Sequence, residues 1–85
     1  MNEIAFDIID ELYFVTPFDD LTRLLNLPEG EICRHLQDLV VQGYVKCFFP
    51  DPDTEVLYQE AEFTLRYREY YYLATKAGLV AHNSR

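Results

Sequence analysis

Residues 29–50 constrain the fold most, because a helical pattern in this stretch changes within a few residues into a strand pattern. From Glu29 to Gln42 the apolar side chains recur at the spacing of one helix face, as Ile32, Leu36, Leu39 and Val40. Gly43 follows as a helix stop. Residues 44–50, YVKCFFP, are rich in the β-branched and aromatic side chains that favour strands. This succession predicts helices and strands within a single α+β unit.

A first helix is predicted near the start of the chain, over residues 2–14. Its acidic side chains fall on one side, while the opposite side carries Ala5, Ile8, Ile9 and Leu12. Asn2 is placed as the N-cap, since its side-chain oxygen can accept a hydrogen bond from a free amide of the first turn.

A second, shorter helix is predicted over residues 16–25. Thr16 is expected to be its N-cap and Pro17 its first helical residue, where a missing amide proton costs nothing. The residues expected to face the core are Leu21, Leu24 and Leu25. Asn26 tolerates the left-handed conformation that ends a helix, so the next helix begins after a tight turn.

The C-terminal third is predicted to contain a second strand and a short helix. Residues 63–73, FTLRYREYYYL, are expected to pair with residues 44–50 as an antiparallel hairpin whose tip, residues 51–62, is long. Whether this tip forms a helix or stays open is not decided by the pattern. Thr75 is expected to cap a last helix within ATKAGLVAHN, residues 74–83.

Length and charge set the broad class of the protein. Its 85 residues, 1–85, are expected to form one domain with a modest core. Fifteen acids against seven Lys and Arg give a net charge of -8. No apolar run is long enough for a membrane span, and the first residues carry acids where a secretory signal carries bases. A cytoplasmic protein without a membrane partner is expected, in which Cys33 and Cys47 are small buried or half-buried thiols.

Two segments resemble a known family. Residues 24–45, LLNLPEGEICRHLQDLVVQGYV, and residues 71–78, YYLATKAG, are similar in order and spacing to the winged-helix variant of the helix-turn-helix family, as found in small bacterial transcription-regulator-like domains. The resemblance covers nearly the whole chain. It implies a three-helix bundle, followed by a two-stranded antiparallel β-hairpin wing and a short C-terminal helix.

The same resemblance implies one candidate function, the reading of duplex DNA by the helix of residues 29–42. Side chains that would lie near base edges are Arg34, His35, Gln37 and Gln42, and those that would lie on phosphates are Lys46, Arg66 and Arg68. The charge pattern opposes this function, because Glu29 and Glu31 start the helix and residues 51–62 hold five acids and no base. DNA binding by a transcriptional regulator is therefore the alternative hypothesis.

The aromatic residues point to a different function. Nine of the thirteen aromatic side chains lie between Tyr44 and Tyr72, and a two-stranded hairpin on a helical bundle buries only one of its faces. Some rings are therefore expected at the surface, where they would contact a partner protein or a second copy in a homodimer. The candidates are Phe48, Phe49, Tyr58, Tyr67, Tyr70, Tyr71 and Tyr72. The opposing interpretation is that most of these rings pack against the helices or the tip.

Other kinds of site find little support in the sequence. Cys33, His35, Cys47 and His82 lack metal-ligand spacing, and the three glycines form no phosphate-binding loop. We therefore expect neither an enzyme nor a cofactor, metal or small-molecule ligand. The leading hypothesis is a small acidic regulatory module that acts mainly through protein–protein interaction, by its aromatic wing and acidic surfaces. The acidic side of residues 2–14 would steer a basic partner towards it.

Overall fold

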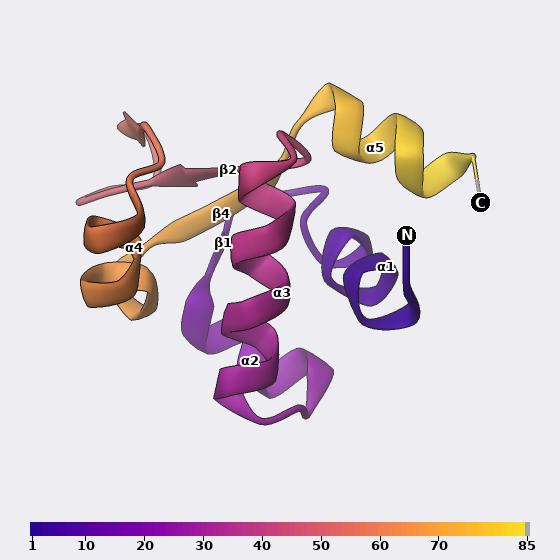
Figure 1. The fold of residues 1–85 in the computed structure, drawn as a ribbon, viewed down its shortest axis with the longest axis horizontal. Helices are drawn as coiled ribbons and strands as arrows, with labels where there is room; N and C mark the ends of the chain where they lie inside the picture. The colour runs from indigo at the N-terminus through magenta and orange to yellow at the C-terminus, as the bar shows by residue number, and fades with distance from the viewer. Residues whose placement is uncertain (85) are drawn as a thin grey trace.

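The computed structural model describes residues 1–84, so Arg85 lies outside the described part of the domain predicted over 1–85. These residues form an α+β fold with an antiparallel sheet in the strand order β1-β4-β2-β3 (Figure 1). The elements, in chain order, are α1 (Glu3–Asp10), β1 (Thr16–Pro17), α2 (Phe18–Leu25), α3 (Glu29–Val41), β2 (Val45–Phe48), β3 (Glu55–Val56), α4 (Glu60–Arg66), the 3-10 helix η1 (Tyr67–Glu69), β4 (Tyr71–Ala74) and α5 (Lys76–Asn83).

The first helix begins as predicted and ends earlier. The Asn2 side-chain oxygen accepts a hydrogen bond from the Ala5 amide at 2.8 Å, which confirms the N-cap. Helix α1 stops at Asp10, whereas the pattern predicted a helix to residue 14. The chain leaves the helix because Leu12 belongs to the sheet side of the core: it is buried, and its carbonyl accepts a hydrogen bond from the Ala74 amide at 2.9 Å.

The prediction for Thr16 and Pro17 is wrong. These two residues form strand β1, which pairs with Tyr72 and Tyr71 of β4, and α2 starts only at Phe18. The Thr16 hydroxyl donates to the Phe14 carbonyl and does not cap the helix. Pairing with the open edge of β4 satisfies the backbone hydrogen-bonding groups of this segment. A local sequence pattern cannot predict this pairing, because β4 is distant in the chain.

The central part of the prediction is confirmed. Asn26 ends α2 with φ 53° and Gly43 follows α3 with φ 82°, both in the left-handed region. Strands β2 and β4 pair antiparallel, with Cys47 opposite Tyr72. The Thr75 hydroxyl caps α5 by accepting a hydrogen bond from the Gly78 amide. One expected core residue of α2 differs, because Leu24 is exposed while Leu21 is fully buried.

The second predicted strand is mostly helical. Only Tyr71–Ala74 of residues 63–73 is a strand, and the preceding residues form α4 and η1. The physical reason is visible in the spacing of Phe63, Tyr67 and Tyr70, at i, i+4 and i+7, which places three rings on one face of a helical path. The packing of these rings outweighs their propensity for strands, so the segment forms α4 and η1, and α4 lies at the end of the molecule opposite α5 (Figure 1).

A single hydrophobic core lies between the helices and the sheet. Helix α3 crosses in front of β2 and β4, and α1 and α5 lie on the same side of α3 (Figure 1). The buried residues come from α1, α2, α3 and one face of the sheet, and they include Ile8, Leu21, Leu36, Val45 and Tyr72. Helix α5 is fixed to α1 by His82, whose ring stacks on Phe6 at 4.0 Å and whose Nδ1 lies 3.1 Å from the Tyr13 hydroxyl.

Candidate functional site

The aromatic residues of the hairpin form a cluster that ties α4 and η1 to the core. Tyr67 packs edge-on against Phe18 of α2 at 5.1 Å between ring centroids, and stacks on Phe63 at 5.9 Å. Tyr70 contacts Phe63 at 6.2 Å and Tyr72 at 6.3 Å. The Tyr72 hydroxyl donates to the Tyr67 carbonyl at 2.8 Å, so even its polar end is satisfied inside the protein.

For three of the seven candidate rings, which are buried, the structure agrees with the opposing interpretation that the rings pack inside the protein. Phe48, Tyr70 and Tyr72 are only 8%, 6% and 0% exposed. The other four candidates are half-buried: Phe49, Tyr58, Tyr67 and Tyr71. The expectation treated the hairpin as two bare strands, whereas α4 and η1 supply a second layer that covers the rings. A surface made of all seven rings is therefore not available to a partner.

The residues expected to read DNA contact other side chains of the same chain. Each arginine of residues 1–84 forms an ion pair with a carboxylate, as Arg23–Asp20, Arg34–Glu31, Arg66–Glu62 and Arg68–Glu29. Gln37 donates to the Tyr58 hydroxyl at 2.8 Å, and the Lys46 ammonium lies 5.8 Å from the centre of the Phe48 ring. His35 lies 3.6 Å from Glu31. The structure thus distributes these side chains between α3, β2 and the α4–η1 segment, and pairs the three arginines among them with carboxylates of the chain.

The first turn of α3 is linked to η1 through Glu29. Its Oε2 accepts hydrogen bonds from the Tyr67 hydroxyl and from the Arg68 Nε, both at 2.7 Å. The Arg68 guanidinium and the Tyr67 hydroxyl hold the pKa of Glu29 below its ordinary value. Burial and the neighbouring carboxylate raise the pKa of Tyr67 to about 12. This link joins residues 38 positions apart, so no local pattern in the sequence could have predicted it.

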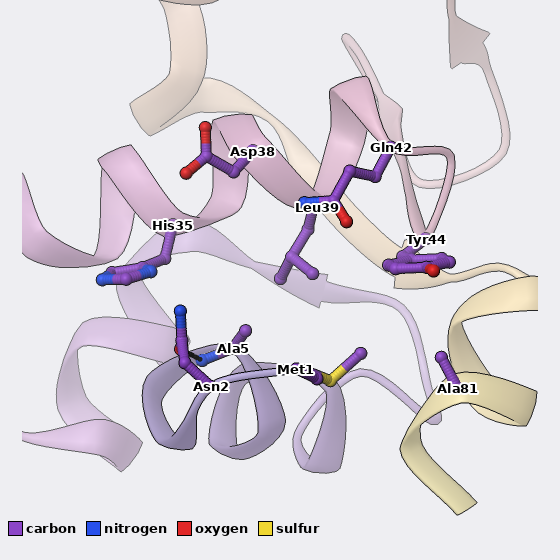
Figure 2. Close-up of a pocket in the computed structure, with 9 residues that line it drawn as sticks. All are labelled: Met1, Asn2, Ala5, His35, Asp38, Leu39, Gln42, Tyr44 and Ala81. Atoms are coloured by element: carbon purple, nitrogen blue, oxygen red, sulfur yellow. Dashed lines mark hydrogen bonds between the residues drawn. The ribbon is translucent and has the colours of Figure 1, made fainter. Parts of the chain in front are cut away.

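A small pocket lies between α1, α3 and α5. Its volume is about 180 Å³, and its walls include His35, Asp38 and Gln42 from α3, at i, i+3 and i+7 of one helix face. Figure 2 shows Asn2 and Ala5 of the α1 side facing α3, with Ala81 of α5 beyond Tyr44. Two residues expected on DNA, His35 and Gln42, therefore line a pocket towards α1.

The two cysteines lie in different environments. Burial raises the pKa of the half-buried Cys33 thiol, and the pKa of the buried Cys47 rises to about 12. Burial favours the neutral thiol at both positions, as predicted for small packed side chains. Within residues 1–84, no three His, Cys, Asp or Glu side chains are grouped to hold a metal ion. None of the helices described is long and apolar enough to cross a membrane.

Comparisons of the chain with protein-family models, with curated proteins and with solved structures find no match. The resemblance to the winged-helix family therefore stays a prediction. The contacts within the chain carry the functional inference that follows.

Proposed function

We propose that this protein is a winged-helix regulatory module that acts by binding a partner protein through its acidic surface. The helices α1 to α3 followed by the antiparallel β2–β4 pair support the winged-helix assignment, because they agree with the order that the sequence resemblance implies. Fold alone does not identify a function, so the choice between protein and DNA as the ligand rests on the surface chemistry.

The observation that carries the proposal is the internal pairing of the arginines. Non-specific affinity for duplex DNA comes from Lys and Arg that displace counterions from phosphates. Here Arg34, Arg66 and Arg68 already face carboxylates at Glu31, Glu62 and Glu29. A phosphate backbone would have to compete with these acids for each guanidinium, which weakens the attraction that DNA binding needs.

The acids that remain favour a basic protein partner. Residues 51–62 carry five exposed acids and no base, and within residues 1–84 only Glu62 of these is paired with an arginine. Helix α1 adds Asp7 and Asp10 on its outer side, both exposed. Such surfaces accelerate the encounter with a positively charged protein and repel nucleic acid.

DNA reading by α3 is the alternative function. In this mechanism the first turn of α3 enters the major groove. That turn contains Glu29, which is hydrogen-bonded to Tyr67 and Arg68 of η1. Base reading here would require the α4–η1 segment to move and an acid to approach the phosphates, so the bonds of Glu29 favour the protein-binding proposal.

The experiment that tests the proposal compares two ligands for the same purified protein. A fluorescein-labelled mixed-sequence duplex and a labelled heptapeptide of alternating lysine and valine are titrated by fluorescence anisotropy at about 50 and 200 mM salt. We expect the peptide to bind, and duplex binding to be weaker than about 100 μM even at the lower salt. The control ligand is the same peptide with glutamate in place of lysine, which should not bind.

The opposite result would identify a DNA-binding protein. Tight duplex binding that falls steeply with salt, and that Arg34→Ala weakens, would overturn the proposal. In that case the peptide with lysine should bind no better than its glutamate counterpart.

A further inference from the structure

Three successive apolar side chains are exposed in the connection between α1 and β1. Tyr13, Phe14 and Val15 all lie at the surface, and the Phe14 side chain is 83% exposed. The chain is buried on either side of them, because Leu12 and Phe18 belong to the core. Single exposed apolar residues are common in proteins, whereas adjacent ones of this size indicate a contact surface.

Hydrogen bonds hold this connection in place. The Thr16 hydroxyl donates to the Phe14 carbonyl at 2.8 Å. The Tyr13 hydroxyl lies 3.1 Å from Nδ1 of His82, which ties the same segment to α5. The position of the exposed rings is therefore set before a partner arrives, so that less conformational freedom is lost on binding.

Acidic side chains flank the exposed rings in the chain. Residues 10–20 contain four acids and no base. One of them, Asp20, is paired with Arg23. The other three lie within five residues of Phe14, as Asp10, Glu11 and Asp19.

Asp10 is also close to the Tyr13 ring in space. The buried His82 ring lies between them, since its Nε2 is 3.4 Å from the Asp10 carboxylate and its Nδ1 is 3.1 Å from the Tyr13 hydroxyl. The Asp10 side chain is still 58% exposed. The face of an aromatic ring attracts a cation, and a neighbouring carboxylate adds to this attraction. The combination therefore favours a lysine or arginine side chain as the group that is bound.

We infer that Tyr13, Phe14 and Val15 form the docking surface for a basic segment of a partner protein, in which a lysine or arginine lies over the Phe14 ring. The inference rests on the proposed function and deepens it, because it names the surface and the chemistry of the partner. An apolar side chain of the same segment packs against Val15. A second copy of the chain is a poor occupant, because it would bring the same acids against each other.

The test maps the binding site of the lysine–valine heptapeptide on the ¹⁵N-labelled full chain by NMR. We expect shifts of the amide signals of Tyr13, Phe14 and Val15. Phe14→Ala should weaken binding about tenfold, and Phe14→Leu, which keeps an apolar side chain but loses the ring, about threefold. The matched control is Leu65→Ala, which also shortens an exposed apolar side chain and should change the affinity less than about 1.5-fold.

A second pair of variants tests the charge beside the rings. Asp10→Asn keeps an acceptor for His82 but removes the negative charge, and should weaken peptide binding about threefold. Asp38→Asn on α3 lowers the net charge equally, at a carboxylate outside the acidic surface of the proposed function. It should change the affinity less than about 1.5-fold.

Four results would overturn the inference. Peptide shifts centred on residues 51–62, unchanged by Phe14→Ala, would reject this surface but leave the protein-binding function standing. Phe14→Leu with the affinity of the wild type would show that the ring binds no cation. Shifts of the Phe14 amide on raising the protein concentration alone would identify a second copy as the occupant. Absence of peptide binding would reject the proposed function as well.

Discussion

Glu29 interacts both with its own helix, α3, and with η1. As the first residue of α3 it stabilises the positive end of the helix dipole. It also accepts hydrogen bonds from Tyr67 and Arg68, and so fixes η1 against α3. The carboxylate form makes both contacts, which is why the pKa of Glu29 lies below its ordinary value.

The lowered pKa of Glu29 predicts that this residue contributes to the loss of folding stability in acid. A carboxylate with a lowered folded-state pKa stabilises the protein above the unfolded-state value, about 4.3 for glutamate, and the contribution is lost as the pH falls through the folded-state pKa. Glu29→Gln should lower the urea midpoint at pH 7 and flatten its decline below about pH 4. The control Asp7→Asn should leave the decline parallel to that of the wild type. A Glu29→Gln curve parallel to the wild type would contradict the prediction.

A side chain at position 78 is expected to clash with the backbone of Tyr44. A Cβ added there would overlap the carbonyl of Tyr44, which also accepts a hydrogen bond from the Thr75 amide. Gly78→Ala should therefore cost about 2–4 kcal/mol of unfolding free energy, measured by urea denaturation. Gly30→Ala is the matched control, since nothing lies within 4 Å of its Cβ position, and it should be neutral or stabilising by up to about 1 kcal/mol. Equal effects of the two changes would refute the steric explanation.

At the scale of elements, α4 is held by its aromatic face more than by its helix propensity. The helix has seven residues, too short to be stable alone. Its Phe63 ring is 1% exposed and contacts Tyr58, Tyr67 and Tyr70. Burial of this ring decides that residues 60–66 are helical, although their neighbours favour a strand.

The prediction for this element compares two residues of the same helix. Phe63→Ala should lower the unfolding free energy by about 3–5 kcal/mol, because a large buried ring leaves a cavity. Leu65→Ala, at a position 73% exposed, should change it by less than about 0.5 kcal/mol. Hydrogen exchange should show that Phe63→Ala releases the amides of α4 first. A strong effect of Leu65→Ala would mean that α4 packs by a different face.

At the scale of the whole molecule, the net charge of -8 opposes the compact state. This value already counts the seven Lys and Arg against the fifteen acids, so the arginine ion pairs leave it unchanged. The unpaired acids of residues 51–62 lie on the α4 side, where Asp53 and Glu60 are exposed. These like charges repel one another in the folded protein.

Screening this repulsion should stabilise the protein. Raising sodium chloride from about 50 to 500 mM shortens the Debye length from about 14 Å to about 4 Å, so the melting temperature should rise by a few degrees. The double variant Asp53→Asn, Glu60→Gln should melt higher at low salt and respond less to added salt. A fall in melting temperature with salt would show that the surface ion pairs outweigh the repulsion.

Local features of the fold follow from residues that are neighbours in the sequence. The cap at Asn2, the helix ends at Asn26 and Gly43 and the cap at Thr75 depend on groups within three or four residues of each other. Interactions over so short a distance form wherever the pattern occurs, so these caps and helix ends were predictable. The strand patterns of the two segments also predicted the antiparallel pairing of β2 with β4, but not the helix α4 between them.

Contacts between segments distant in the chain decide which side chains the hairpin buries and which it exposes. Strand β1 forms because its residues pair with the edge of β4. Residues 60–69 are helical because the Tyr67 ring packs against the Phe18 ring of α2. The hydrogen bonds of Glu29 and the pocket between α1, α3 and α5 likewise involve segments that are distant in the chain. Such contacts depend on which surfaces meet after the helices have packed, and burial of an aromatic face outweighs the strand propensity of its residues.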